Sequence, residues 1–355
     1  MAHMSARLAR LLMLGVVISV PSVVLLCSLL YQPDRHQKSD IDEIDVLDYE
    51  PSTRTLNVVN ATAMFSVRGS VDFDCPLVGM GSLSKRFPIC TYADDHVSSF
   101  ALNGEVFMAS EIDAILRRLA TMAAPAEDDD DDGRPTTFVD LGANIGSYSL
   151  PVAVAGHRVI AVEANYETAR RLARAIQLGD LTDRVTLVNN AVTDRYGNEV
   201  SMFVATQNRG DSYIPRDSTS GCDGRTLRPG EFCQTTPVRT ITLDDLLPLM
   251  TPGERAIMKV DIQGSEVIAF NRRTANKFLT LVVVQAIIME WVAYIVTTSY
   301  DGSKYASNVG DSKKVKRFLK FARSLSYTFH DLNSTALDRN WRKWPYDILM
   351  LKKRK

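Results

Sequence analysis

The sequence has no excess of either charge sign and no internal repeat. It contains 41 lysine and arginine residues against 42 aspartate and glutamate residues, which gives a formal net charge of -1. A general nucleic-acid binder would show a basic balance or a basic stripe, so we expect no nucleic-acid partner. The basic run at residues 352–355 is interpreted as a solvated tail.

Cysteine is scarce, with five residues in a chain of 355. Four of them lie outside the apolar amino-terminal segment and form two local pairs, Cys75 with Cys90 and Cys222 with Cys233. An even number at short spacing is typical of disulfides formed in an oxidising compartment. The alternative is that all four are free thiols in a cytosolic domain.

One long apolar run is present near the amino terminus. No charged residue occurs between Leu11 and Pro33, and residues 11–31 have roughly the 20-residue length that a membrane helix needs. A cleaved signal peptide would have a shorter apolar core and a clear small-residue cleavage site. We therefore predict a transmembrane signal anchor at 11–31, through which the chain is attached to a membrane.

The predicted location of the remaining chain rests on the cysteines and on two N-x-S/T sequons, at Asn60 and Asn333. Sequons in a lumenal domain are open to glycosylation. We predict a single-pass type II membrane glycoprotein of the Golgi or endoplasmic reticulum, with a lumenal catalytic domain. Basic residues on the two sides of the apolar run are nearly balanced, so the positive-inside rule alone does not decide the orientation.

Composition divides the chain into five parts. An acid-rich stretch follows the apolar run and is expected to stay extended as a stem. Apolar residues at helical spacing, from Ile112 to Leu119, predict an amphipathic helix that packs on the cofactor side of a sheet. Consecutive acids at 127–132 are typical of a solvated loop and are given no chemistry. The predicted parts are a short tail at 1–10, the anchor at 11–31, the acidic stem at 32–54, an extension with the helix and the acidic loop at 55–133, and an α/β domain at 134–355.

A strand, a glycine turn and a helical pattern follow one another from Phe138 to Tyr148. Gly142 and Gly146 allow the backbone to approach a ligand closely, and the helix offers unpaired N–H groups. A second strand ends in Glu163, 23 residues beyond Asp140, and a ribose-binding carboxylate is expected about 20 residues on. A dinucleotide fingerprint reads G-x-G-x-x-G, whereas this turn reads D-x-G-x-N-x-G. The acid would repel a pyrophosphate and suits a ligand that carries an ammonium or sulfonium cation.

The order of these motifs resembles the FkbM-type family of S-adenosylmethionine-dependent methyltransferases, over about residues 90–352. The family pattern D-x-G-A-N-x-G is present from Asp140 to Gly146, and Glu163 stands at the family's ribose acid. Further matches, in chain order, are Asn190-Ala191, T-L-D-D-L from Thr242 to Leu246, and Lys259 to Glu266, which is close to the family's K-x-D-x-E-G-x-E. Gln263 replaces the usual glutamate of that last pattern, so the role of this position is open.

The resemblance implies a class I methyltransferase (Rossmann-like) fold, an α/β doubly wound sheet that is mostly parallel with an antiparallel edge strand. The implied cofactor is S-adenosyl-L-methionine. Apolar runs between turn signals predict the individual strands and a late helix. The predicted strands are 138–141, 158–162, 185–188, 199–203, 256–261, 281–288, 327–329 and 346–351, and the late helix is 314–325.

Ligands of open parallel sheets bind beyond the carboxyl ends of the strands, and this rule predicts the cofactor site. Asp140 is expected at the methionine part of the cofactor, Glu163 at its ribose and Asn190 at its adenine edge. The glycine turn is expected to shape the pocket. The predicted cofactor-binding residues are Asp140, Gly142, Asn144, Gly146, Glu163 and Asn190.

Two carboxylates are the predicted catalytic residues, because methyl transfer to oxygen needs orientation and one base. Asp261 ends its strand beside the expected methyl position, and Glu290 ends the next apolar run. They would act as base and orienting partner, or as ligands of a divalent cation, which could bind there but is not predicted. The alternative is that Asp261 caps a helix beginning near Gly264 and that Glu290 pairs with a basic residue. Lys259 is expected to pair with an acid at the strand's end.

Residues 206–235 are too many for an ordinary connection, and a disulfide is predicted near their end. We expect this segment to cover the acceptor site. The side chains expected to face the acceptor are Arg209, Asp211, Tyr213 and Arg216. A plain surface insertion is equally consistent with the composition.

The predicted function is that of a membrane-anchored S-adenosylmethionine-dependent O-methyltransferase, with a hydroxyl of a glycan or glycoconjugate as acceptor. N- or carboxyl-methylation of a protein or small molecule is the alternative within the same fold. A non-catalytic, membrane-tethered binding protein of this fold is the alternative from another class, and the Gln263 departure favours it slightly.

Mass spectrometry of the full chain, digested without reduction, is expected to find Cys75 linked to Cys90 and Cys222 linked to Cys233. Each link would stabilise the fold by on the order of 3 kcal/mol, because it restricts the unfolded chain. Four free thiols in protein secreted through an oxidising compartment would contradict both pairings.

Overall fold

The computed structural model describes residues 56–65, 73–123, 136–214, 227, 229–234, 236–291 and 312–353. Within these ranges, no helix combines the length and the apolar character needed to cross a membrane. The predicted anchor at 11–31, stem at 32–54 and acidic loop at 127–132 lie outside the described residues and stay predictions.

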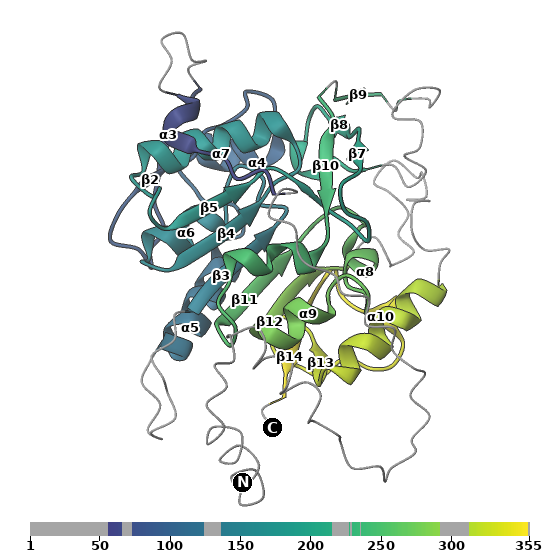
Figure 1. The fold of residues 1–355 in the computed structure, drawn as a ribbon. Coiled ribbons are helices and arrows are strands. Elements are labelled where there is room, and N and C mark those ends of the chain that lie inside the picture. The colour runs from purple at the N-terminus through teal and green to yellow at the C-terminus, as the bar shows by residue number, and fades with distance from the viewer. Residues whose placement is uncertain are drawn as a thin grey trace, which may run out of the picture. The chain divides into compact units, whose positions relative to one another are not determined.

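Seven strands form the central sheet, in the order β13-β14-β12-β11-β3-β4-β5 (Figure 1). The strands from β12 to β5 run parallel, and β14 lies antiparallel between β12 and β13. The predicted mixed α/β sheet is confirmed, although its antiparallel strand β14 is second from the edge. The bounds are β3 Thr136–Leu141, β4 Arg158–Val162, β5 Val185–Val188, β11 Arg255–Val260, β12 Val283–Glu290, β13 Tyr327–His330 and β14 Asp347–Lys352.

Helices cover both faces of this sheet, because its central strands are apolar on both sides. In β3, Val139 and Leu141 belong to one hydrophobic core, whereas Phe138 belongs to the other. The first core also contains residues of α8 to α10, and the second contains residues of α4 to α7. The helices are α3 Ala61–Met64, α4 His96–Leu102, α5 Ala109–Ala123, α6 Ser149–Val154, α7 Tyr166–Leu178, α8 Glu266–Ala269, α9 Asn276–Leu281 and α10 Ser312–Ser324.

Two predicted strands differ from the observed ones. The strand expected at 199–203 is two strands, because β7 pairs with β10 while β8 pairs with β9, so the chain changes sheets between them. The strand β12 begins later than expected because α9 occupies the residues up to Leu281. The short elements are β1 Leu77–Val78, β2 Phe87–Pro88, β6 Ala191–Val192, β7 Glu199–Val200, β8 Phe203–Ala205, β9 Glu231–Cys233, β10 Val238–Ile241, and the 3-10 turns η2 Arg209–Asp211, η4 Leu243–Leu249 and η6 Trp341–Lys343.

A disulfide joins Cys75 and Cys90 beside the paired strands β1 and β2, as the sequence predicts. It ties together the two ends of a short excursion in the amino-terminal extension. Cys222 lies outside the described residues, so its pairing with Cys233 stays a prediction.

All three tryptophans of the chain lie in one buried aromatic cluster. The ring centroid of Trp291 is 5.2 Å from that of Trp344 and 6.3 Å from that of Trp341. Phe318 of α10 lies 6.0 Å from Trp291. These rings pack α10 and η6 against the end of β12.

A buried carboxylate ties the amino-terminal ends of three central strands together. Glu254, which is 2% exposed, lies just before β11 and pairs with Arg158 at the start of β4, with 2.8 Å between Oε1 and Nη1. The same oxygen accepts a hydrogen bond from the Thr137 hydroxyl of β3. The other oxygen accepts one from the Thr251 backbone N–H at 2.8 Å.

Replacing Glu254 with alanine is expected to lower the free energy of unfolding by about 2 kcal/mol, because it removes the hydrogen bonds of a buried carboxylate to Thr137, Arg158 and Thr251. Urea denaturation of the full-length chain, followed by tryptophan emission, measures the change. Glu199→Ala is the matched control, since its pair with Arg239 spans 3.7 Å at an exposed position and is worth less than about 1 kcal/mol. Equal losses in the two variants would contradict the assignment.

Candidate active site

The turn between β3 and α6 requires glycine for a reason that the sequence does not reveal. Gly142 has a φ of +84°, and a Cβ at this position would lie 1.8 Å from the carbonyl oxygen of Asp261. Strands β3 and β11 meet there, with the Asp261 N–H donating to Leu141. The expected close approach is therefore made by the neighbouring strand end. Gly146, with a φ of +94°, leaves room for the Leu172 side chain of α7.

The Glu163 carboxylate joins this turn to the end of β4. Its Oε2 accepts from the Asn144 N–H at 2.8 Å, and its Oε1 accepts from the Asn165 N–H at 2.7 Å. Asn165 in turn caps the start of α7. Each carboxylate oxygen keeps a further lone pair for another donor. Burial raises the pKa of Glu163 to about 7, against the lowering effect of the two backbone hydrogen bonds.

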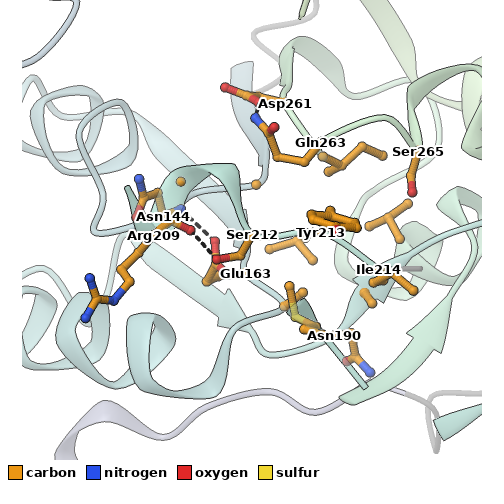
Figure 2. A pocket seen from close by; sticks show the side chains of 18 residues that line it. Asn144, Glu163, Asn190, Arg209, Ser212, Tyr213, Ile214, Asp261, Gln263 and Ser265 are labelled. Atoms are coloured by element: carbon orange, nitrogen blue, oxygen red, sulfur yellow. Dashed lines mark hydrogen bonds between the residues drawn. The ribbon is translucent and has the colours of Figure 1, made fainter. Parts of the chain in front are cut away.

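A hollow opens at the carboxyl ends of the parallel strands, with Glu163 on one side and Asp261 and Gln263 on the other (Figure 2). Its cavity volume is about 70 Å³. Small-molecule sites usually measure roughly 300–1,000 Å³, so some lining side chains must turn aside for a nucleoside-sized ligand. The lining residues that the sequence predicted for the cofactor or catalysis are Gly142, Asn144, Glu163, Asn190 and Asp261.

Two predicted cofactor residues, Asp140 and Gly146, do not line this hollow. Gly146 packs on α7, and Asp140 is 1% exposed with its Oδ2 accepting from the Ser149 hydroxyl at 2.6 Å. Burial raises the pKa of Asp140 to about 6. The Oδ1 atom of Asp140 and the Oδ1 atom of Asn144 are buried without a hydrogen-bond partner among the described residues. Leaving such atoms unsatisfied is costly, and a cationic or hydrogen-bonding ligand would relieve that cost.

Asn190 lines the hollow while its amide fastens two other segments. Its Oδ1 accepts from the Asn57 N–H at 2.7 Å, and its Nδ2 donates to the Arg239 carbonyl at 2.9 Å. Its predicted contact with an adenine edge therefore has to use the remaining hydrogen-bonding capacity of the amide.

A buried lysine pairs with a carboxylate on the opposite side of the hollow from Glu163. Lys259 is 3% exposed, and its Nζ lies 3.1 Å from Asp261 Oδ2, as the sequence predicts. Gln263 Nε2 donates to Asp261 Oδ1 at 2.8 Å and to Glu290 Oε2 at 3.3 Å. Burial raises the pKa of Glu290 well above its usual range, and the charges of Asp261 and Glu266 add to this effect.

The helix-capping role considered for Asp261 is filled by another residue, whereas Glu290 does interact electrostatically with a basic residue, Lys259. Glu266 satisfies the turn before α8 instead, because its Oε1 accepts from the Ile262 and Gly264 N–H groups, each at 3.1 Å. Ligand oxygens of Asp261, Glu266 and Glu290 lie within 4.8 Å of one another and could hold a cation. The Gln263 amide donates to two of these residues, Asp261 and Glu290. The catalytic assignments stay predictions.

The segment after β8 lines the hollow, and its predicted role at the acceptor site stays a prediction. Arg209 and Tyr213 line the hollow with Gly210, Ser212 and Ile214, and Asp211 is not among the lining residues. Arg216 lies outside the described residues. The sequence argument missed Met202, Ile262 and Ser265, which carry no chemical signal of their own.

Comparisons with known proteins agree with this geometry. Residues 140–302 match the family model of the methyltransferase FkbM domain. The protein carries a methyltransferase FkbM domain. The predicted resemblance and the enzyme class are thereby confirmed, and methyltransferases with this domain use S-adenosylmethionine. The unsatisfied oxygens of Asp140 and Asn144 and the spare lone pairs of Glu163 fit such a cofactor.

Solved structures with the same kind of fold are distant in sequence. An O-methyltransferase from Bacillus cereus, in complex with S-adenosylhomocysteine, is 16% identical over 73% of this chain and 98% of its own, with a TM-score of 0.31. A human methyltransferase 10 domain containing protein is 10% identical over 68% and 81%, with a TM-score of 0.34. A precorrin-6y C5,15-methyltransferase from Geobacter metallireducens is 12% identical over 74% and 98%, with a TM-score of 0.32. Curated protein sequences gave no significant match.

The affinity of the protein for its cofactor is expected to decrease as the pH is lowered through the raised pKa of Glu163. Ribose hydroxyls donate to the ionised carboxylate, and protonation near pH 7 removes an acceptor. S-adenosylhomocysteine should therefore bind about tenfold more weakly at pH 6 than at pH 8. Calorimetry at both pH values tests this. Glu163→Gln should bind weakly with little slope over this range, and a wild-type Kd that is equal at both values would contradict the role.

Proposed function

We propose that this methyltransferase transfers its methyl group to a hydroxyl oxygen, and that Asp261 is the base that accepts the hydroxyl proton. The observation that carries the proposal is the position of this carboxylate. Asp261 lines the hollow beside Gly142, and its side chain is 33% exposed while that of Lys259 is 4% exposed. An exposed, oriented carboxylate at the mouth of a cofactor site can reach an acceptor proton.

The neighbouring residues fix the orientation of this carboxylate. Lys259 and Gln263 donate to its two different oxygens. Burial raises the pKa of Glu290 and so favours its protonated form, which suits this residue to the role of orienting partner. Glu163 and Asn144 would hold S-adenosylmethionine, which would supply an electrophilic methyl group on a sulfonium. The chain's own contribution is to align the acceptor and to receive the proton.

We further propose that the acceptor belongs to a glycan or glycoconjugate and that the catalytic domain faces the lumen of the Golgi or endoplasmic reticulum. The proposed amino-terminal anchor and the Cys75–Cys90 disulfide support this location, since disulfides persist in oxidising compartments. Asn60 and Asn333, the acceptor residues of the two sequons, are exposed. A cluster of carboxylates around the acceptor side is also suited to hydrogen bonding with several hydroxyls.

The acceptor chemistry is tested with full-length protein in detergent and S-adenosylmethionine labelled on the methyl group. Glycoconjugates, proteins and small molecules from the secretory pathway are offered separately. Label that survives mild base and is released with glycans after glycosidase treatment supports an O-methyl ether. Base-labile label points to a methyl ester and label retained on amino acids points to N-methylation, and either result would reject the proposal. Cofactor binding without transfer to any acceptor class would favour the non-catalytic alternative.

Asp261→Asn is expected to lower kcat by at least about 100-fold, the usual contribution of a general base, with little change in the Kd of S-adenosylhomocysteine. Initial rates and calorimetry on the same preparation measure the two quantities. Asp331→Asn is the control, because Asp331 satisfies a turn remote from the hollow by accepting from the Thr335 N–H. Full turnover by Asp261→Asn would exclude Asp261 as the base.

A further inference from the structure

The segment Asn208–Ile214, called the strap below, lies across the glycine turn. A Cβ at Gly210 would be 3.1 Å from Asn144 Nδ2, so the strap backbone lies close to a side chain of the glycine turn. Arg209, Tyr213 and Ile214 of the strap line the hollow (Figure 2). The strap is therefore one wall of the cofactor site.

The far end of the strap is fixed by pairing with β8. The Tyr213 N–H donates to the Phe203 carbonyl at 3.0 Å, and the Phe203 N–H donates back at 2.9 Å. The two rings stack with centroids 5.4 Å apart and planes 17° apart. This end does not depend on the amino-terminal extension.

The near end is fixed by one carboxylate of the amino-terminal extension. Asp95 Oδ1 accepts from the Arg209 N–H at 2.6 Å, and Asp95 is 6% exposed. Its Oδ2 caps α4, accepting from the N–H of Ser98 at 2.9 Å and from its hydroxyl at 2.8 Å. The adjacent His96 N–H donates to the Gln207 carbonyl at 2.9 Å. One side chain thus completes a helix and holds the wall of the hollow.

A second contact supports the same attachment. The Arg209 guanidinium lies 4.7 Å from the centroid of the Tyr92 ring. The Arg171 guanidinium of α7 lies 3.5 Å from that centroid, and the Tyr92 hydroxyl is 2.9 Å from the Thr168 hydroxyl of α7. The part of the extension that anchors the strap is therefore itself seated on α7.

We infer that Asp95 is a positioning residue for cofactor binding, because it holds the strap against Asn144 before the cofactor arrives. The inference rests on the cofactor part of the proposed function and is independent of the acceptor. Without the hydrogen bond to Arg209, part of the free energy of cofactor binding would be spent on ordering the strap. A strap that is ordered in advance avoids this cost, and the affinity for the cofactor is higher. The purely structural alternative is that Asp95 serves only to cap α4.

Asp95→Ser separates the two roles. Serine is a good helix cap and can accept from the Ser98 N–H, but its single oxygen cannot also reach the Arg209 N–H. The full-length variant should keep its Tm and tryptophan emission and bind S-adenosylhomocysteine about tenfold more weakly, as expected for loss of a hydrogen bond to a charged group. KM for S-adenosylmethionine should rise while kcat at saturation is retained. Asp331→Ser, at the remote turn, is the matched control and should match wild type.

The rate of trypsin cleavage after Arg209 measures how accessible the strap is. Cleavage after Arg195, in an exposed turn, is the internal reference. Asp95→Ser should be cut faster at Arg209 and equally fast at Arg195, and S-adenosylhomocysteine should protect Arg209 at lower concentration in wild type. A Kd and a cleavage rate equal to those of wild type would overturn the inference.

Gly210→Val keeps the inference testable if Asp95→Ser does not fold. A Cβ at position 210 lies 3.1 Å from Asn144 Nδ2 and 3.2 Å from Asn208 Oδ1. Valine therefore disturbs the contact between the strap and the glycine turn while Asp95 and α4 remain intact, so it should reproduce the weaker binding. Normal affinity in Gly210→Val would overturn the role of the strap. Absence of binding in wild type is a separate result, because it would reject the cofactor part of the proposed function and not the Asp95 attachment alone.

Discussion

The hydrogen bonds of the Glu163 carboxylate are the interaction on which the rest of the site depends. This side chain is buried at the end of β4 and accepts backbone N–H groups from the turn after β3 and from the start of α7. It therefore fixes the position of this turn relative to the start of α7. Burial of a carboxylate is costly, and the backbone donors offset part of that cost. The pKa of Glu163 stays raised because the cost of burial exceeds the stabilisation by these two donors. Further hydrogen-bond donors from a ligand would lower it.

The departure of Gln263 from the family's glutamate is consistent with the charges around it. Asp261, Glu266 and Glu290 lie within one small region, and Lys259 is the cation among them. A fourth carboxylate at position 263 would add repulsion, whereas the amide donates to both Asp261 and Glu290. Gln263 also has a φ of +50°, and non-glycine residues in this region are typical of functional sites. The substitution therefore preserves an ordered acceptor side and does not by itself indicate a lost activity.

The sequence predicts those features whose signals are local. Strands β3, β4, β5 and β11 are continuous apolar runs between turns, and their ends carry the acids and amides that mark a nucleoside site. The path of residues 199–214 could not be predicted, because it depends on β7 pairing with β10 and β8 pairing with β9. The Asp95–Arg209 bond joins residues 114 positions apart and leaves no periodic pattern. Gly142 was predicted to let the backbone approach a ligand closely, whereas the close neighbour in the structure is the Asp261 carbonyl at the end of another strand.

The aromatic cluster around Trp291 gives the molecule an internal optical probe of restricted range. Because the chain holds no tryptophan outside this cluster, its ultraviolet emission reports the junction of β12, α10 and η6. Neither the strap nor Glu163 belongs to the cluster. Tryptophan emission can therefore follow global unfolding and is largely insensitive to changes at the glycine turn. The emission of a tryptophan introduced on the strap would be measured over a constant contribution from this cluster.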